Sequence, residues 1–365
     1  MSSIKITNIS NRTGSSGAVV SGVSTSSGTG SAKIPSGTTG ERVGIESGSL
    51  RYNSTDNTLE FYNGTSWLTI SQSSSLINAR GVFGSGLNPA TQNTLDYITI
   101  ATTGNATDFG DLTLGRFYVA ACSSSTRGVF GGGATPTSNN TIDYITIASV
   151  GNAIDFGDLT VARQRLAACS SSTRGVFGGG YVTPATQNTL DYITIATTGD
   201  ATDFGDLTVA RQYLAACSSS TRGVFGGGAT PADTNTIDYI TIATTGNATD
   251  FGDLTVARFA LGACSSSTRG VFGGGNPSTN TIDYITIASV GNATDFGDLT
   301  VARYGLASCS SSTRGVFGGG YVTPAAQNVI DYITIATTGN ATDFGDLNVG
   351  RFALAACSNG HGGIS

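Results

Sequence analysis

Cations and histidine are scarce in this chain of 365 residues. Lysine occurs only at Lys5 and Lys33, charged residues make up 12% of the sequence, and the formal net charge is −6. A nucleic-acid partner requires a stripe of Lys and Arg to neutralise phosphates, so we predict no nucleic-acid binding. Histidine occurs once, at His361. We therefore expect no Ser/His/Asp or Cys/His catalytic residues, no His-based metal site and no cofactor.

Long apolar runs are also missing. No run approaches the length of about 18 residues that a membrane-spanning helix needs, so we predict no membrane insertion. The N-terminal MSSIKITNIS lacks the apolar stretch of a signal peptide, so we expect synthesis in a cytoplasm. The cysteines fall once in each unit of the repeat described below, which is no disulfide framework, because equivalent positions are a whole unit apart. We predict buried free thiols at Cys122, Cys169, Cys217, Cys264, Cys309 and Cys357.

Glycine and one repeated unit are abundant. Glycine numbers 52, and Ser, Thr and Asn fill much of the remaining sequence. From residue 80 to the C-terminus a unit that runs from RGVF to ACSSST is written six times. The units begin at Arg80, Arg127, Arg174, Arg222, Arg269 and Arg314, which are 45 to 48 residues apart. A period of this length is typical of a solenoid or a propeller.

Each unit contains four predicted strands. In the second unit they are GVFGGG at 128–133, the alternating TIDYITIA at 141–148, the stretch 156–161, and LAACSSS at 166–172. Four short strands in a unit of this length are typical of a propeller blade. We therefore predict an all-β fold in which residues 80–365 form a six-bladed β-propeller with four strands per blade.

One set of residues recurs in all six units: an apolar pair before two glycines, a tyrosine in the next strand, an aromatic residue followed by leucine, and a small residue before arginine. In the second unit these are Val129, Phe130, Gly131, Gly132, Tyr144, Phe156, Leu159, Ala162 and Arg163. The set resembles the kelch repeat over roughly four fifths of the chain. Kelch units place a Trp after the Tyr at a shorter interval, whereas here Phe follows Tyr by 12 residues every time. The predicted fold is therefore kelch-like, and the partners of kelch proteins do not transfer to it.

The ends of the array predict how it closes. The array begins with a GVF strand and ends with a small-residue strand at 353–358, which no further GVFGGG follows. The resemblance to kelch-like propellers implies that the small-residue strand is the innermost of its blade. We therefore expect 353–358 to pair with 81–86 and to close the ring, which leaves no edge strand exposed.

Two segments differ most between the units. The first joins the GVFGGG strand to the TIDYITIA strand, for example YVTPATQNT at 181–189 and NPSTNT at 276–281, and the second is the pair after the repeated arginine, such as Gln164-Arg165. Antiparallel strands alternate in direction, so both segments lie on one face of the predicted propeller, opposite the stem and the C-terminus. Tyr and Phe among polar residues suit binding to sugars or to a protein surface. The candidate binding residues are Phe117, Tyr118, Gln164, Arg165, Tyr181, Gln212, Tyr213, Phe259, Tyr304, Tyr321 and Phe352. The alternative is that these loop residues vary without a function.

The motif DFGD also occurs in every unit. We interpret its carboxylates, such as Asp108 and Asp111, as turn residues and as partners of the repeated arginine. A calcium site at these carboxylates is an alternative interpretation.

The first 79 residues differ from the array. Residues 1–47 are rich in Ser, Gly and Thr, which cannot bury a core, and we interpret them as an attachment stem. Residues 48–79 contain a predicted hairpin with Leu59, Phe61 and Trp67 as apolar anchors. The pattern GxLRYN…LEFYNGxxW resembles a small module common in the stems of bacteriophage tail fibres and other virion appendages. A generic hairpin is the alternative.

These resemblances imply a non-enzymatic structural protein of a bacteriophage virion, made in the host cytoplasm. As a tail fibre, an appendage or a surface decoration, it would present the propeller to a host cell-surface glycan or protein. Residues 1–79 would bind a tail or capsid protein, and the stem would form a homo-oligomer, often a trimer in phage fibres. The alternatives are a cellular kelch-like adaptor and a glycan-cleaving enzyme. An adaptor would carry a recruitment domain, and a glycan-cleaving enzyme would need paired acidic residues, whereas the variable loops carry only Asp233.

Overall fold

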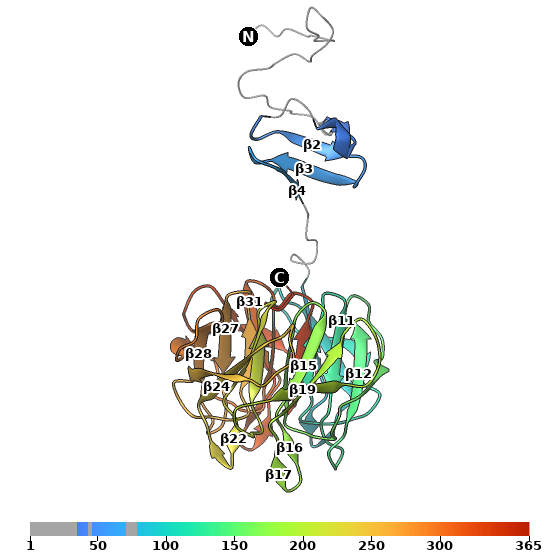
Figure 1. Ribbon diagram of the computed structural model, residues 1–365. Coiled ribbons are helices and arrows are strands. Elements are labelled where there is room, and N and C mark those ends of the chain that lie inside the picture. The colour runs from blue at the N-terminus through green and yellow to red at the C-terminus, as the bar shows by residue number, and fades with distance from the viewer. Residues whose placement is uncertain (1–34, 43–45, 71–78, 365) are drawn as a thin grey trace, which may run out of the picture. The chain divides into compact units, whose positions relative to one another are not determined.

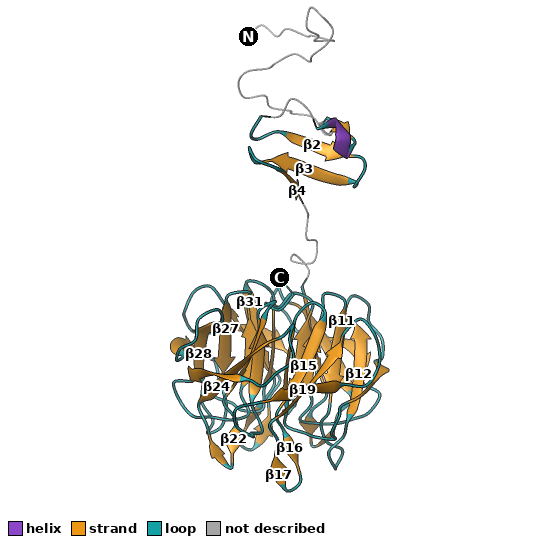
Figure 2. Cartoon of the chain, in the orientation of Figure 1, coloured by secondary structure: helices purple, strands orange, loops and turns teal. Residues whose placement is uncertain are grey.

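The computed structural model describes residues 35–42, 46–70 and 79–364, and the chain divides into two compact units, Met1–Ser73 and Ser74–Ser365. Its regular structure is almost entirely β-strand (Figure 2). The described part contains no helix that is long and apolar enough to cross a membrane. Most of the attachment stem expected at 1–47 lies outside the described residues.

The first unit holds a four-stranded sheet in the order β1-β2-β3-β4. Its elements are β1 (Ser36–Gly37), the 3-10 turn η1 (Thr39–Glu41), β2 (Leu50–Asn53), β3 (Thr58–Tyr62) and β4 (Trp67–Ile70). β1 pairs with β2 in parallel, and the other pairs are antiparallel. The sheet therefore contains more than the expected hairpin, and it begins before residue 48.

The polar face of this sheet is buried and its apolar face is exposed, which is the reverse of what the apolar residues predict. Arg51, Asn53 and Glu60 are buried on one face, where Arg42 and Arg51 both form ion pairs with Glu60. The other face exposes large apolar side chains, namely Leu50, Tyr52, Phe61, Leu68 and Ile70. Phe61 is 37% exposed, so its prediction as an apolar anchor is wrong. A polar network, rather than an apolar core, holds the described part of this unit together.

The second unit contains six four-stranded antiparallel sheets (Figure 1). The first strands are β10 (Ala120–Ser123), β14 (Ala167–Ser170), β20 (Ala215–Ser218), β26 (Gly262–Ser265), β30 (Ala307–Ser310) and β36 (Ala355–Ser358). The second strands, in the order of the chain, are β5 (Arg80–Gly84), β11 (Arg127–Gly131), β15 (Arg174–Gly178), β21 (Arg222–Gly226), β27 (Arg269–Gly273) and β31 (Arg314–Gly318).

The third and fourth strands complete each sheet. The third strands are β8 (Thr94–Thr99), β12 (Thr141–Thr146), β18 (Thr189–Thr194), β24 (Thr236–Thr241), β28 (Thr281–Thr286) and β34 (Val329–Thr334). The fourth strands are β9 (Thr107–Asp111), β13 (Ile154–Asp158), β19 (Thr202–Asp206), β25 (Thr249–Asp253), β29 (Thr294–Asp298) and β35 (Thr342–Asp346).

Four of the segments that join second to third strands form small hairpins, which the sequence did not predict. They are β6 (Leu87–Asn88) with β7 (Ala90–Thr91), β16 (Tyr181–Val182) with β17 (Ala185–Thr186), β22 (Ala229–Thr230) with β23 (Ala232–Asp233), and β32 (Tyr321–Val322) with β33 (Ala325–Ala326).

All four strands of the second unit of the repeat differ in their bounds from the predicted ones, and for two of them the local cause is clear. The second strand ends at Gly131 because Gly132 and Gly133 have φ angles of 69° and 99°, a left-handed conformation that leaves the ladder. The fourth strand covers Ile154–Asp158 rather than 156–161. It ends there because Leu159 turns to donate its N–H to the carbonyl of Asn140.

The first strands of the six sheets lie around a common centre. Contacts run from β10 through β14, β20, β26 and β30 to β36, and β36 also contacts β10. β36 comes from the C-terminus and pairs with β5, in the register Ala355↔Gly84 to Ser358↔Gly81. The predicted pairing between the last and first strands of the array is therefore present, over residues 355–358.

Aromatic and sulfur atoms fill the space between neighbouring sheets. A Cβ atom on Gly84 would lie 2.9 Å from the ring of Phe130, and one on Gly128 would lie 2.5 Å from Sγ of Cys357, so these close approaches require glycine. All six cysteines are free and buried, as predicted. Burial raises the pKa of Cys122 and of Cys217 to about 12, so both thiols are protonated at neutral pH.

The repeated arginine pairs with the aspartate of the IDY motif. Nη2 of Arg116 lies 2.6 Å from Oδ2 of Asp143, and both side chains are 0% exposed. Arg116 follows β9 and Asp143 lies in β12, so the pair joins two neighbouring sheets. The equivalent pairs are Arg163–Asp191, Arg211–Asp238, Arg258–Asp283, Arg303–Asp331 and Arg351–Asp96. The prediction that the DFGD carboxylates are turn residues and partners of this arginine is therefore wrong. Asp108 lies within β9, the outermost strand of its sheet, and is exposed to water.

The second unit has two faces, which we name by what lies on them. The variable face carries the segments between second and third strands, including β16, β17 and β22 (Figure 1). The opposite face, on which the C-terminal segment lies and at which the chain enters the first sheet, is the entry face (Figure 1). On the entry face, Arg80 donates its N–H to Oδ1 of Asn359 at 2.8 Å. The start of the array and the C-terminal segment therefore lie side by side.

Candidate binding site on the variable face

The two variable segments of each unit meet on the variable face. The first residue of each pair after the repeated arginine forms an isolated antiparallel bridge with a residue that follows the second strand. These bridges are Phe117↔Ala134, Gln164↔Tyr181, Gln212↔Ala229, Phe259↔Asn276, Tyr304↔Tyr321 and Leu87↔Phe352. The most variable residues of the repeat are thus gathered in one place, although they come from different parts of each unit.

The second residue of each pair forms a ring at the centre of this face. The six residues, in order around the ring, are Tyr118, Arg165, Tyr213, Ala260, Gly305 and Ala353. All six have positive φ angles, between 54° and 66°. Each donates its backbone N–H to the carbonyl of the preceding member at 2.7 to 3.0 Å, and Tyr118 donates to Ala353. The left-handed conformation, which is unfavourable for side chains other than glycine, is held by this cycle of hydrogen bonds.

The ring has a large half and a small half. Tyr118, Arg165 and Tyr213 are consecutive, and the next three positions are alanine, glycine and alanine. Counting around the ring places Arg165 opposite Gly305. The large side chains of the ring therefore lie on one side of the centre, and the ring positions on the other side carry small residues.

A pocket with a volume of about 70 Å³ lies inside the ring. Its floor is aliphatic and consists of the residues that follow each ring position, which are Val119, Leu166, Leu214, Leu261, Leu306 and Leu354. These side chains are at most 6% exposed. The pocket combines an apolar floor with an aromatic and cationic wall, as small-molecule sites commonly do.

The Arg165 side chain is held among neutral groups. Its Cζ atom lies 5.4, 4.9 and 4.7 Å from the ring centroids of Tyr118, Tyr181 and Tyr213. Its Nη1 donates a hydrogen bond to Oε1 of Gln212 at 2.8 Å. Burial raises the pKa of Tyr213 above its usual range, as does the proximity of Tyr118, and the Arg165 charge opposes this only in part. The Tyr213 hydroxyl is therefore neutral at physiological pH and able to donate a hydrogen bond.

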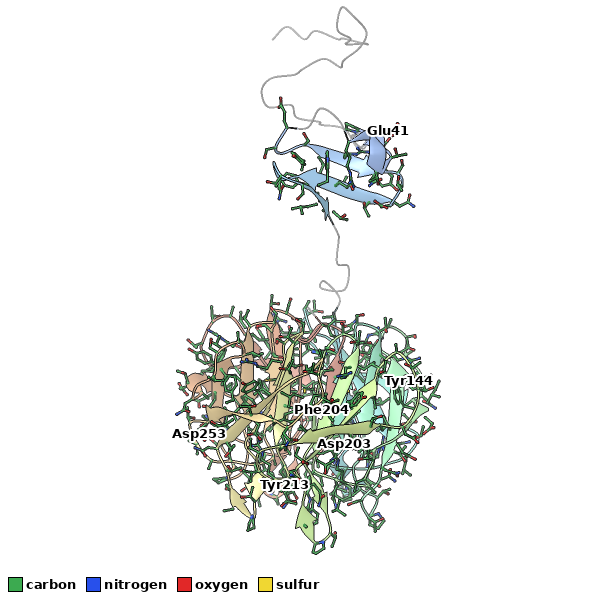
Figure 3. All side chains as sticks on the ribbon, in the orientation of Figure 1. Glu41, Tyr144, Asp203, Phe204, Tyr213 and Asp253 are labelled. Atoms are coloured by element: carbon green, nitrogen blue, oxygen red, sulfur yellow. The ribbon has the colours of Figure 1, made fainter. Side chains whose placement is uncertain are left out.

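The predicted site residues fall into two aromatic groups. One is a series of ring contacts from Phe117 through Tyr118 and Tyr213 to Phe259, which encloses Arg165 together with Tyr181 and Gln212. The other group is Tyr304, Tyr321 and Phe352. Figure 3 shows Tyr213 towards the end of the unit that carries β22.

Gln164 is the one candidate binding residue that is buried. Its side chain is only 8% exposed, and its Nε2 lies 3.5 Å from Oγ of Ser138, to which it donates. The bridge between Gln164 and Tyr181 draws it under the neighbouring loop. Its role as a binding residue stays a prediction, and the burial of Gln164 leaves little of it accessible to a ligand.

Sequence reasoning missed the small half of the pocket. Ala260, Gly305 and Ala353 line it, yet they carry no group that marks a site. The signal that could have found them was their position, which is the same in the repeat as that of Tyr118, Arg165 and Tyr213. Comparing side-chain size at that position around a ring indicates an opening, whereas looking only for aromatic residues does not.

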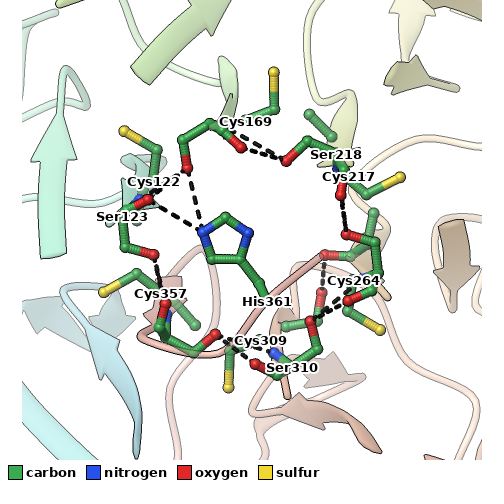
Figure 4. Close-up of a pocket in the computed structure, with 18 of the residues that line it drawn as sticks. Cys122, Ser123, Cys169, Cys217, Ser218, Cys264, Cys309, Ser310, Cys357 and His361 are labelled. Carbon is green, nitrogen blue, oxygen red and sulfur yellow. Dashed lines mark hydrogen bonds between the residues drawn. The ribbon is translucent and has the colours of Figure 1, made fainter. Parts of the chain in front are cut away.

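A second pocket, of about 50 Å³, lies at the entry face between the first strands and His361 (Figure 4). Ser123, Ser170, Ser218, Ser265, Ser310 and Ser358 form a cycle here, in which each hydroxyl donates to the carbonyl of a neighbouring member. His361 lies at the centre of the cycle, and the cysteine sulfur atoms point away from it (Figure 4). The C-terminal segment thus fills the centre of the unit at this face.

Protonation of His361 is predicted to release this segment. Gly363 donates its N–H to Nδ1 of His361 at 3.0 Å, which requires a neutral ring. Burial lowers the pKa of His361 to about 4, although the Ser123 carbonyl opposes the shift. Stability from this site is therefore present above the unfolded pKa of 6.5 and is lost as the pH falls through about 4. Because His361 is the only histidine, its single imidazole signal in NMR should titrate near pH 4. An apparent pKa near 6.5 would show that the segment is not docked.

Comparisons with known proteins do not assign this arrangement. No protein-family model matches the chain, and no characterised protein sequence matches it. Among the described residues, no three side chains of His, Cys, Asp or Glu gather as metal ligands would. The geometry of the variable face is therefore the basis for a functional assignment.

Proposed function

We propose that the second unit is a six-bladed kelch-like β-propeller, and that its variable face binds a host cell surface as part of a bacteriophage virion. The protein is then a non-enzymatic structural protein, present as a tail fibre, an appendage or a surface decoration. The observation that carries this proposal is the ring at the variable face. Six nearly identical sheets support six positions at which the side chains range from glycine to tyrosine and arginine. A scaffold that repeats closely, while the residues gathered on one face vary, is consistent with binding at that face.

The first unit would provide attachment and assembly. Its exposed sheet face carries Leu50, Tyr52, Phe61, Leu68 and Ile70, and an apolar face of this kind is suited to being covered by another protein surface. We assign this face to contacts with further copies of the stem, as in a trimer, and residues 1–79 to binding a tail or capsid protein. The resemblance of 48–67 to phage-fibre stem modules supports this assignment.

Labelling of intact particles tests the virion assignment. An antibody raised against residues 80–365 should label purified phage particles in electron micrographs. A preparation in which the antibody detects the soluble protein but never the particles would contradict a place in the virion.

Exchange of one variable loop tests the binding face. Replacing 181–189 by the sequence of 276–281 removes Tyr181, whose ring lies 4.9 Å from the Arg165 guanidinium, while both loops are already compatible with the repeat. We expect host adsorption to fall roughly tenfold, and the thermal unfolding temperature to change little. The matched control replaces residues 196–200, which join a third strand to a fourth strand, by the sequence of the equivalent segment 148–152. Equal adsorption by the exchange variant and the control would contradict binding at the variable face.

A further inference from the structure

Arg165 differs from every other arginine of the second unit. Six arginines pair with buried aspartates, as described above. Another six lie at the starts of the second strands and stack on a tyrosine of their own sheet; they are Arg80, Arg127, Arg174, Arg222, Arg269 and Arg314. Arg165 belongs to neither set, and the sequence contains no lysine after Lys33. Among the described residues of this unit, Arg165 is therefore the one cationic side chain that has no equivalent in the other copies of the repeat.

Among the described residues, the charge of Arg165 has no counter-ion. No carboxylate of the described residues lies within 4.0 Å of its guanidinium, whereas each of the six aspartate-paired arginines has one. Its Nε is buried and donates to no atom of the described part. Tyrosine faces and one glutamine oxygen stabilise the guanidinium, but they leave its positive charge unneutralised. A partly desolvated cation of this kind favours an anion beside it.

The pocket limits the size and shape of that anion. Arg165 lines the pocket opposite Gly305, above the floor of buried leucines. The volume of about 70 Å³ holds a small oxyanion with a few further atoms. Tyr118 and Tyr213 line the pocket beside Arg165, and aromatic side chains can pack against the C–H groups of a sugar.

An extended acidic peptide fits this site less well. A peptide that adds to a sheet needs a strand edge of several residues. On the variable face the described strands outside the main sheets are only two residues long, as in β16, β17, β22 and β23. The site therefore favours a compact ligand over an extended chain.

We propose that the pocket inside the ring binds an anionic sugar unit, with its carboxylate or phosphate on Arg165 and its ring against Tyr118 and Tyr213. The planar guanidinium matches either oxyanion through paired N–H donors. This inference rests on the proposed function and names the chemical class of the host-surface ligand. A carboxylated or a phosphorylated glycan would supply the same chemistry, and the experiment distinguishes between them.

Direct binding of defined sugars tests this inference without a phage. The full chain is titrated calorimetrically with an oligosaccharide ending in glucuronic acid, with its carboxyl-reduced form ending in glucose, and with glucose 6-phosphate. We expect binding of the glucuronate or the phosphate ligand, and at least tenfold weaker binding of the neutral ligand. Binding by only one of the two anions identifies the source of the charge.

Two variants remove the site in different ways. Arg165→Ala should weaken anion binding roughly ten- to a hundredfold, since a charge-assisted hydrogen bond is lost. The fold tolerates alanine here, because Ala260 and Ala353 occupy equivalent ring positions with φ angles of 54° and 56°. Gly305→Tyr keeps the arginine but fills the open half of the ring, and it should abolish binding. Tyr213 shows that tyrosine is accepted at an equivalent position with a φ of 58°.

Controls separate this inference from the proposed function. Arg127→Ala removes one positive charge from the entry face and should leave sugar binding unchanged. Thermal unfolding of each variant shows whether it is folded. The inference is overturned if neither anion binds, if the neutral sugar binds equally well, or if a glutamate-rich peptide competes as effectively as the sugar. Any of these results leaves the adsorption test of the loop exchange standing, so that failure here and failure of the proposed function are distinguishable.

Discussion

A chain that ends at Leu354 should not form a cooperatively folded second unit. It lacks β36, so β5 loses the partner that pairs with it from Ala355↔Gly84 to Ser358↔Gly81. Val82 and Phe83 on β5 are both 0% exposed in the full protein, and exposing a side chain of this kind costs about 1.5–3 kcal/mol. Their combined loss approaches the total stability of about 5–15 kcal/mol that is typical of a domain. Circular dichroism on heating should show no sharp transition.

A slightly longer chain is the matched control. A chain that ends at Ser358 keeps β36 and loses only the segment with His361. We expect it to unfold cooperatively, a few degrees below the full chain. If the chain that ends at Leu354 unfolds at the same temperature as this control, the pairing of β36 with β5 does not hold the unit together.

Asp238→Ala should destabilise the protein by about 3–5 kcal/mol, the range for breaking a buried ion pair by removing one partner. Asp238 and Arg211 are both 0% exposed, and Nη2 of Arg211 lies 2.7 Å from Oδ2 of Asp238. The Oγ1 of Thr208 also donates to Asp238, at 2.5 Å. Removal of the carboxylate leaves a buried guanidinium without its counter-ion. Urea denaturation of the full chain measures the loss.

Asp206→Ala is the control for the loss of a carboxylate from the neighbouring sheet, at the end of the strand that precedes Arg211. Asp206 is the last residue of β19, in the DFGD motif, and is only partly buried. We therefore expect its replacement to change the free energy of unfolding by no more than about 0.5 kcal/mol. The double replacement Arg211→Met with Asp238→Leu should recover most of the stability, because neither charge then remains buried. Equal destabilisation by Asp238→Ala and Asp206→Ala would show that the buried pair is not the stabilising one.

Local patterns predicted the strands of the repeat well and their partners less well. Alternation in TIDYITIA and the small residues of LAACSSS indicate strands because such patterns bury one face of a sheet, and strands β12 and β14 lie there. The aspartate that pairs with the repeated arginine was misassigned. Each unit has two aspartate motifs, and the correct partner lies on the neighbouring sheet, which sequence proximity does not indicate.

The first unit shows the same limit of prediction from local sequence. The spacing of Leu50, Tyr52 and Phe61 predicts strands, which β2 and β3 are. The spacing does not reveal which face is covered within the unit. There the ion pairs of Glu60 with Arg42 and Arg51 cover the polar face, and the apolar face is left exposed.

The sequence by itself determined that residues 80–365 are a six-fold repeat of four strands, that the cysteines are buried, and which segments vary. Those features depend on periodicity and local composition, which can be read directly from the order of residues in the chain. Only the tertiary structure decided that the second residues of the variable pairs form one ring, that the large side chains lie together on one half of it, and that Arg165 has no counter-ion among the described residues. These features depend on which residues of different units come together around a centre, and distances across that centre are not encoded in the spacing within any one unit.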